Sequence, residues 1–271
     1  MKVVLVDNGS LEPAAHAGLR AAAAAIGAKA DVRVEAVSWK HSDRIPPAAL
    51  SGGPARTLAP WIRAQVSAGE REFLLVPFFI SPQGAIGSAL RGDLVRLQRE
   101  TGGFDFSFTR GLADGAALAE IVADRVRQAA AAGGLRRPRV IVVDHGGPSR
   151  ASSEIRDRVA GAVRAELGKS VGPLGAASME SPRGPGFEFN RPLLADLLAQ
   201  ADSGDVLIAP LFLLPGRHAG PGGDLGRIAR DAQARLPGLR CHFTELVGTH
   251  PGAIDALAGA VASALGAEAT P

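Results

Sequence analysis

The chain alternates short apolar runs with longer helical patterns, many of them rich in alanine. In its first half, apolar runs bounded by polar residues, Gly or Pro lie at residues 2–6, 32–37, 73–78 and 104–108. Helical patterns follow them at residues 13–26, 57–68, 90–100 and 115–130. Buried strands that alternate with helices are typical of a parallel sheet covered on both faces. The pattern therefore predicts an α/β domain with a mostly parallel, four-stranded sheet.

The second half repeats this order after a polar hinge around residues 133–139. Strand patterns lie at residues 140–143, 172–178, 205–211 and 239–245, and helical patterns at 152–167, 191–201, 224–235 and 252–265. The residues are also similar, since LVDNGS at 5–10 parallels VVDHGG at 142–147 and LLVPFFISP at 74–82 parallels LIAPLFLLP at 207–215. Self-similarity of this kind indicates a duplicated unit. We predict two tandem, doubly wound, flavodoxin-related domains, residues 1–132 and 138–271, with a cleft between them.

Composition excludes several classes of protein. Hydrophobic residues make up 46% and charged residues 21%, which indicates a globular chain. Aromatic residues make up only 4%, the net charge is only +3, and arginine is scattered, so we expect no nucleic-acid partner. The single cysteine excludes a disulfide framework and a Cys-rich zinc module. The first apolar run stops at Asp7, too early for a signal peptide, and no run of about 18 apolar residues exists, so we expect a cytoplasmic protein without a membrane partner.

Ligands of open parallel sheets bind beyond the carboxyl ends of the strands. In the second half, three strands deliver His145, Glu180 and His218 to that edge. Neutral imidazoles suit first-row divalent metals, and a carboxylate can add a ligand or accept protons. Two histidines and one glutamate leave coordination positions open, as a transient or catalytic metal site requires. These residues are the predicted metal ligands and catalytic groups.

The same positions of the first half carry different residues. Asn8 corresponds to His145, Lys40 corresponds to Glu180, and the loop that corresponds to the one with His218 contains Gln83 but no histidine. A lysine ammonium repels a divalent cation. The first half therefore has a degenerate site, although His41 beside Lys40 is close enough in sequence to contribute.

The motifs of the second half resemble those of a known family. They are VVDHGG at 142–147, SME at 178–180, PLFLLPGRH at 210–218 followed by DL at 224–225, and VGTHP at 247–251. This combination resembles the class II tetrapyrrole chelatases, the CbiX/SirB-type sirohydrochlorin chelatases, whose long members are tandem repeats. The chain differs in having His-Gly-Gly for His-Gly-Ser, its histidines in the second half, and a Gly/Pro-rich loop at residues 181–189.

The resemblance implies an enzyme that inserts Co²⁺ or Fe²⁺, with Ni²⁺ a further option, into sirohydrochlorin during cobalamin or sirohaem biosynthesis. His145 and His218 would bind the incoming metal and handle pyrrole protons, and Glu180 would assist. The metal is then a substrate. No G-x-x-x-x-G-K-[ST] motif is present, so we expect no nucleotide.

Sirohydrochlorin carries many carboxylates, so its site should be cationic. Arginine suits carboxylates because its planar fork donates two parallel hydrogen bonds. Arg150, Arg183, Arg191 and Arg217 flank the predicted edge, and Gly146 and Gly147 would let the backbone approach the ligand. We expect the tetrapyrrole to contact residues of this set, with Lys40 facing it from the other domain.

Three alternatives remain open. The protein could be a non-catalytic carrier of metal or tetrapyrrole, or a chelatase for a different tetrapyrrole, which the loop at residues 181–189 suggests. A flavodoxin-like redox protein is less favoured because no phosphate loop is evident. Monomer and homodimer are both compatible with the sequence.

Overall fold

The structure is a computed structural model that describes residues 1–80, 85–201, 203–219 and 222–268. Its strands form two four-stranded sheets, with strand orders β2-β1-β3-β4 and β6-β5-β7-β8. Every pairing within them is parallel. The predicted fold class, two α/β domains with parallel four-stranded sheets, is confirmed.

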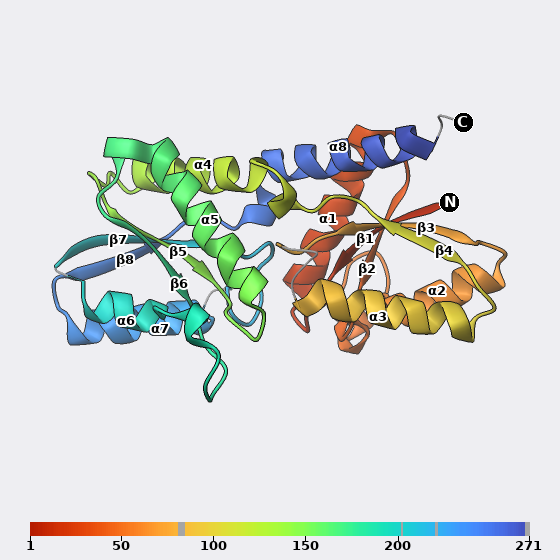
Figure 1. Ribbon diagram of the computed structural model, residues 1–271, viewed down its shortest axis with the longest axis horizontal. Coiled ribbons are helices and arrows are strands. Elements are labelled where there is room, and N and C mark those ends of the chain that lie inside the picture. The colour runs from red at the N-terminus through yellow and green to blue at the C-terminus, as the bar shows by residue number, and fades with distance from the viewer. Residues whose placement is uncertain (81–84, 202, 220–221, 269–271) are drawn as a thin grey trace. The chain divides into compact units, whose positions relative to one another are not determined.

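The first compact unit consists of Met1–Asp114 together with Pro251–Pro271. In Figure 1, α1 and α8 lie on one face of its sheet and α2 and α3 on the other. Its strands are β1 (Lys2–Asp7), β2 (Val34–Ser38), β3 (Glu72–Pro77) and β4 (Asp105–Phe108). Its helices are α1 (Pro13–Ala30), α2 (Leu58–Ser67), α3 (Ala85–Glu100) and α8 (Pro251–Glu268).

The second compact unit is Gly115–His250. Helices α4 and α5 lie on one face of its sheet and α6 and α7 on the other (Figure 1). Its strands are β5 (Arg139–Asp144), β6 (Leu174–Ser178), β7 (Gly204–Pro210) and β8 (Leu239–Phe243). Its helices are α4 (Ala117–Ala132), α5 (Arg150–Leu167), α6 (Leu194–Ala199) and α7 (Asp224–Arg235).

Burial explains why these runs form strands. The two central strands of each sheet are almost entirely buried along their length, whereas the outer strands β4 and β8 are only partly buried. A strand covered by helices on both faces needs apolar side chains on both, which the runs VVLV and VIVV supply. The apolar runs therefore locate the centre of each sheet.

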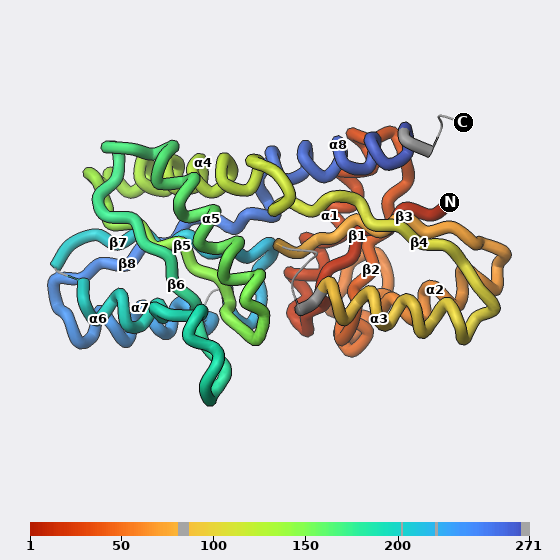
Figure 2. Tube along the Cα trace, in the orientation of Figure 1, coloured from red at the N-terminus to blue at the C-terminus, as the bar shows by residue number. Residues whose placement is uncertain are grey.

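The compact units differ from the predicted halves 1–132 and 138–271. Helix α4, which ends the first half, packs on α5 and β7, and α8, which ends the second half, packs on α1. Figure 2 shows blue α8 beside red α1 and yellow-green α4 beside green α5. The repeats exchange their last helices. A sequence repeat defines the order of elements, but the same amphipathic helix can cover either sheet.

Candidate metal site

The three predicted ligands lie at the carboxyl edge of the second sheet. His145 follows β5, Glu180 follows β6, and His218 lies between β7 and α7. Strand β5 pairs with both of the others, so all three segments leave the sheet side by side. The backbone pairing continues past the strand ends, because Glu180 N–H donates to the His145 oxygen at 3.1 Å. The structure thus brings the predicted residues together.

The two histidines face one another. Their ring centroids lie 4.6 Å apart with an interplanar angle of 86°. Phe212 flanks both rings, with its centroid 6.4 Å from His145 and 6.5 Å from His218. The side chains are 43% and 30% exposed, respectively. A partly open pair of imidazoles beside an apolar ring can receive a cation from solvent.

The hydrogen bonds of the histidines determine which ring nitrogens can bind a metal. His145 Nδ1 lies 2.9 Å from the Gly146 backbone oxygen, and His218 Nδ1 lies 2.7 Å from Asp224 Oδ2. Both oxygens accept, so in the neutral imidazoles these contacts place the proton on Nδ1. The Nε2 atom of each ring then has the lone pair that a metal requires.

Asp224 is a site residue that the sequence showed only as part of a motif. Its carboxylate is held by Arg227 at 2.6 Å as well as by His218. These hydrogen bonds, first that of Arg227 and then that of His218, keep the pKa of Asp224 below its ordinary value. An ionised carboxylate behind a metal-binding histidine orients its ring and raises its basicity. Its position at the start of α7, six residues after the histidine, is the signal that could have identified it.

Glu180 lies beside the histidine pair and is 60% exposed, with Oε1 3.7 Å from His145 Nε2. The neighbouring Gly146 has a φ of +81°, and a Cβ at this position would collide with the Glu180 backbone oxygen. Glycine is therefore required for the close approach of the two loops. Within the described residues no group of three or more His, Cys, Asp and Glu side chains is already arranged around a metal position.

The loop that follows Glu180 is fastened by a buried residue that the sequence did not reveal. Asn190 is fully buried. Its side chain accepts from Gly147 N–H at 3.0 Å and donates to the Gly147 oxygen at 2.9 Å. Gly147, predicted as a ligand contact, thus joins the His145 loop to the segment that leads into α6. An asparagine within a Gly/Pro-rich loop gives no sequence signal of such a role.

The predicted arginines lie around this edge in different settings. Arg217 is 84% exposed and its Nε lies 3.8 Å from Asp224. Arg183 is exposed in the loop after Glu180. Arg150 lies over the Phe189 ring, 4.9 Å from its centroid, and Arg191 is paired with Asp196 at 2.7 Å. The first three present guanidinium groups to solvent, and their contact with a substrate stays a prediction.

The equivalent edge of the first sheet contains a different network. Asp93, at the position of Asp224, accepts from Trp39 Nε1 at 3.0 Å and lies 3.4 Å from Lys40 Nζ. Arg96 also contacts this carboxylate, at 2.7 Å. Gln83 lies outside the described residues, and His41 is exposed with a φ of +71°. In this unit Lys40 takes the position of Glu180, a predicted metal ligand, and is paired with Asp93.

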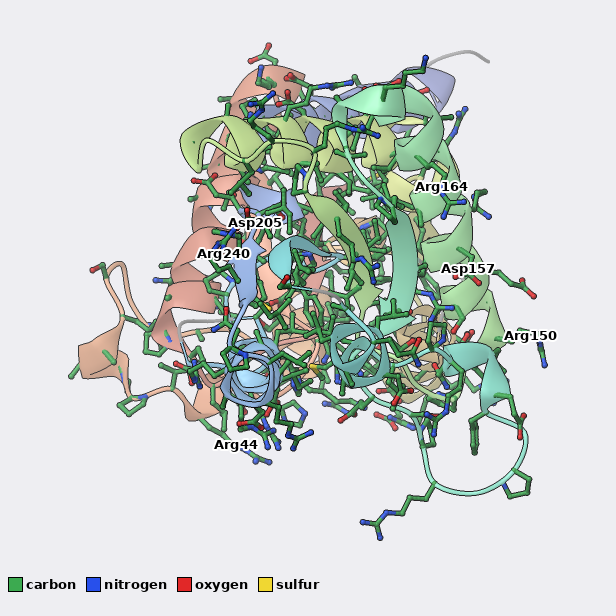
Figure 3. All side chains as sticks on the ribbon, turned by 90° about the vertical axis from the view of Figure 1, so that its left-hand side faces the viewer. Arg44, Arg150, Asp157, Arg164, Asp205 and Arg240 are labelled. Carbon is green, nitrogen blue, oxygen red and sulfur yellow. The ribbon has the colours of Figure 1, made fainter. Side chains whose placement is uncertain are left out.

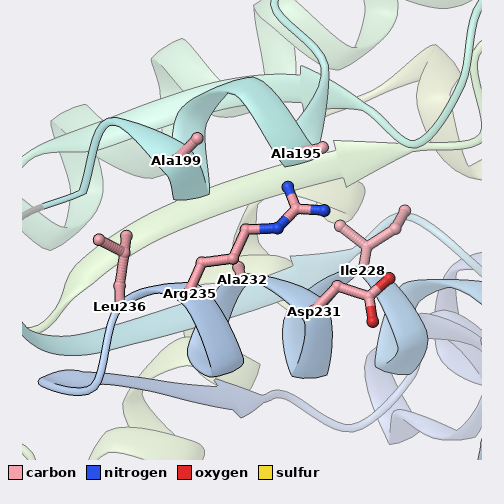
Figure 4. Close-up of a pocket in the computed structure, with 7 residues that line it drawn as sticks. All are labelled: Ala195, Ala199, Ile228, Asp231, Ala232, Arg235 and Leu236. Carbon is pink, nitrogen blue, oxygen red and sulfur yellow. The ribbon is translucent and has the colours of Figure 1, made fainter.

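Other features of the second unit lie outside this arrangement. A pocket between α6 and α7 contains no predicted site residue (Figure 4). It is lined by five aliphatic and two charged side chains: Ala195, Ala199, Ile228, Ala232, Leu236, Asp231 and Arg235. His250 is paired with Asp124 of α4 at 2.9 Å. Burial raises the pKa of the Cys241 thiol to about 11, which keeps it protonated and unreactive. Across the described residues, no helix is both long and apolar enough to cross a membrane.

The fold and site can be compared with known proteins. A structure of SirB from Bacillus subtilis with Fe³⁺ has a TM-score of 0.67 and 16% identity over 100% of this chain and 98% of that one. SirB from Bacillus subtilis subspecies spizizenii in complex with cobalt has a TM-score of 0.64 and 16% identity over 96% and 94% of the two chains. CbiX, described as the terminal enzyme of sirohaem biosynthesis in denitrifying bacteria, has a TM-score of 0.65 and 18% identity over 97% and 99%.

Sequence comparison is consistent with these structures. No curated protein matches the chain. The model of the CbiX family matches twice, at residues 2–129 and 139–264. These two matches follow the internal repeat and together span most of the chain. The predicted resemblance is confirmed, and the chain belongs to the CbiX family.

Proposed function

We propose that this protein inserts a divalent metal, Co²⁺ or Fe²⁺, into sirohydrochlorin without ATP. The observation that carries the proposal is the facing pair of His145 and His218, 4.6 Å apart at one sheet edge. The similar structures of SirB with iron and with cobalt support it. The family membership supports the same reaction class.

The geometry suits a metal that passes through. A closed structural zinc site has four protein ligands, whereas a site that exchanges its metal leaves positions open. Here two Nε2 atoms are oriented by Gly146 and Asp224, and Glu180 is the exposed third group. The histidines would hold the ion loosely enough to release it to the macrocycle.

Metal insertion must also remove two pyrrole protons. Proton transfer needs an acceptor within reach of the reacting nitrogen and a pKa near the working pH. Glu180 can accept a proton, and so can a histidine once it has released the metal. Asp224 Oδ2 lies 2.7 Å from His218 Nδ1 and holds this ring with Nε2 free to face the reacting nitrogen. The proton can then leave to solvent from these partly exposed side chains.

The test is anaerobic incubation of the purified chain with sirohydrochlorin and Co²⁺ or Fe²⁺, followed by absorption spectroscopy. We expect metallated product to form faster than in the protein-free reaction, without stimulation by ATP. His218→Ala should slow insertion by about 100-fold or more, the scale of a lost acid–base group. Insertion at the protein-free rate, or an unchanged rate in His218→Ala, would contradict the proposal.

The same experiment separates the alternatives. Stoichiometric binding of Co²⁺ or tetrapyrrole without a rate enhancement would indicate a carrier. Turnover with another free-base tetrapyrrole but not with sirohydrochlorin would indicate a chelatase of different specificity. The loop after Glu180 is the feature that favours this second outcome, because it borders the site and differs from the family's pattern.

A further inference from the structure

An arginine lies buried beneath the candidate metal site. The Arg156 side chain, on the second turn of α5, is only 1% exposed. Burying a guanidinium is costly unless it is paired and its donors are satisfied. A buried arginine therefore needs an explanation from its contacts.

Those contacts join three segments of the second unit. Arg156 Nη1 donates to Ser178 Oγ at 2.5 Å and lies 3.6 Å from Asp144 Oδ1. Its Nη2 donates to the Phe189 backbone oxygen at 3.1 Å. Its Nε donates to Asp157 on the same helix at 2.8 Å. One planar group thus holds the end of β5, the end of β6 and the loop before α6.

These segments carry the proposed ligands. Asp144 immediately precedes His145, and Ser178 lies two residues before Glu180. Ser178 also hydrogen-bonds to Asp144, so the two strand ends are joined both directly and through Arg156. Asn190, next to Phe189, continues the connection to Gly147. A rigid hydrogen-bonded support of this kind keeps ligands in their productive geometry.

The first unit shows that the fold does not require an arginine here. The equivalent position on α1 is occupied by Leu19, which is fully buried. Asp7 and Ser38 at the equivalent strand ends still hydrogen-bond to each other. That unit has no ligand pair to support, since Asn8 and Lys40 stand in place of the histidine and glutamate.

We propose that Arg156 is a positioning residue that sets the placement of His145 relative to Glu180. The inference rests on the proposed function, because it assigns the arginine to the metal-holding step. It acts through Asp144 and Ser178 and does not touch the metal. Its loss would leave the fold of the second unit intact and let the two ligand-bearing loops separate.

The experiment compares Arg156→Leu, the residue of the first unit, with Arg156→Lys, Ser178→Ala and the matched control Arg164→Leu. Arg164 lies on the same helix and donates to the backbone oxygen of Leu174, at the opposite end of β6. Figure 3 shows Arg150, Asp157 and Arg164 along α5, with Arg164 at the end far from Arg150. Each variant is titrated with Co²⁺ alone, followed by its absorption bands, and separately with metal-free sirohydrochlorin, followed by fluorescence.

We expect Arg156→Leu to weaken Co²⁺ binding by about 10–100-fold, the usual effect of losing an outer-shell partner. Its Co²⁺ bands should change and its kcat fall, whereas sirohydrochlorin binding stays unchanged. Arg156→Lys should recover part of the affinity, and Arg164→Leu should match the wild type. Circular dichroism shows whether each variant is folded.

A folded Arg156→Leu variant with wild-type Co²⁺ affinity and bands would overturn the inference, as would an equal loss in Arg164→Leu. If Arg156→Leu does not fold, Ser178→Ala decides, because it removes one contact of the fork: unchanged Co²⁺ binding there is the overturning result. Absence of Co²⁺ binding by the wild-type chain would overturn the proposed function as well. Binding that is indifferent to Arg156 overturns this inference alone.

Discussion

At the carboxyl edge of the first sheet, Gly9 packs against the backbone oxygen of Lys40, and at that of the second, Gly146 packs against the backbone oxygen of Glu180. Both glycines have positive φ, and in both a Cβ would collide with the neighbouring loop. The backbone hydrogen bonds beside these glycines are also alike. Trp39 N–H donates to the Asp7 backbone oxygen and Met179 N–H to the Asp144 backbone oxygen, each with an N···O distance of 2.8 Å. The two edges have the same local backbone arrangement, and they differ in the side chains that they carry.

The difference lies in what surrounds one carboxylate. In the first unit Asp93 is held by Trp39, Lys40 and Arg96, so no Nε2 atom is oriented by it. In the second unit Asp224 is held by His218 and Arg227. An equivalent aspartate therefore pairs with a lysine and an arginine in one unit and orients the imidazole of a proposed metal ligand in the other. The backbone supplies the position, and only a few side chains determine the chemistry.

The strongest way to break this comparison is to give the second unit the residues of the first. The double variant His145→Asn, Glu180→Lys should lose Co²⁺ binding, because it removes one ligand and adds a positive charge at the site. Insertion should fall to the protein-free rate. Co²⁺ titration and absorption spectroscopy measure both effects. Asn8→Ala in the first unit is the control and should change neither; insertion that survives the double substitution would refute the assignment of the site to the second unit.

A second test uses the buried aspartates that precede Asn8 and His145. Burial raises the pKa of Asp7 from 3.8 to about 6, and one of its oxygens has no hydrogen-bond partner. Between these pH values the folded unit binds more protons than the unfolded chain, so stability falls as pH rises through 6. Asp7→Asn should stabilise the first unit at pH 8 by up to about 3 kcal/mol, a gain that disappears below about pH 4.

Urea unfolding followed by tryptophan fluorescence measures this gain. Both tryptophans of the chain, Trp39 and Trp61, lie in the first unit. The matched variant Asp144→Asn should stabilise the second unit by less, because Arg156, 3.6 Å from Asp144 Oδ1, offsets part of the burial that raises the pKa of Asp144. Hydrogen exchange of β5 and α5 reports that effect. Equal stabilisation of the two units at pH 8 would show that the arginine does not distinguish them.

Asp224→Asn tests the orienting role of that carboxylate. The variant should lower kcat and Co²⁺ affinity by about 10–100-fold, because His218 loses an anionic partner that keeps Nε2 toward the metal. The equivalent substitution Asp93→Asn in the first unit should leave insertion unchanged, although it removes the partner of Lys40. Steady-state kinetics and Co²⁺ titration measure both variants. Equal losses from the two substitutions would mean that both edges take part.

The smallest effects concern the exposed arginines. Arg183→Ala and Arg217→Ala should each raise the KM for sirohydrochlorin by several-fold, since exposed ion pairs contribute about 1 kcal/mol or less. The kcat should not change, and the effect should shrink at high salt. Arg191→Ala, whose guanidinium is already paired with Asp196, should have a smaller effect. A KM that is insensitive to salt in the wild type would contradict electrostatic recognition of the carboxylates.

Much of the fold was predictable because it depends on hydrophobic pattern. The central strands are apolar on both faces, and α7 was predicted with the bounds that the structure has. The proximity of His145 and His218 was predictable because the strands that precede them are neighbours and end at the same edge. The helix predicted at residues 191–201 is only Leu194–Ala199, because a 3₁₀ turn at Glu188–Asn190 and an extended stretch precede it.

The rest depends on contacts that leave little trace in sequence. Arg156 lies on the apolar face of α5, together with Ile155, Val159 and Ala160. This placement was the one sequence signal that Arg156 is buried. Asn190 lies in a loop, where asparagine is common for local reasons. The exchange of α4 and α8 had no signal, since each helix is apolar enough for either sheet. The sequence indicates the candidate ligands, whereas the residues that hold the ligand-bearing loops become visible only in the three-dimensional structure.

The exchange of helices also affects how the protein is made. A nascent chain leaves the ribosome from its N-terminus, and domains generally fold as they emerge. The second unit, Gly115–His250, is continuous and complete before Pro251 is synthesised, whereas the first unit also needs α8, which follows the second unit in the sequence. Helix α1, which packs against α8, therefore lacks this partner until residues 251–268 have been synthesised. The unit that carries the candidate metal site can therefore be complete while the first unit still lacks one of its helices.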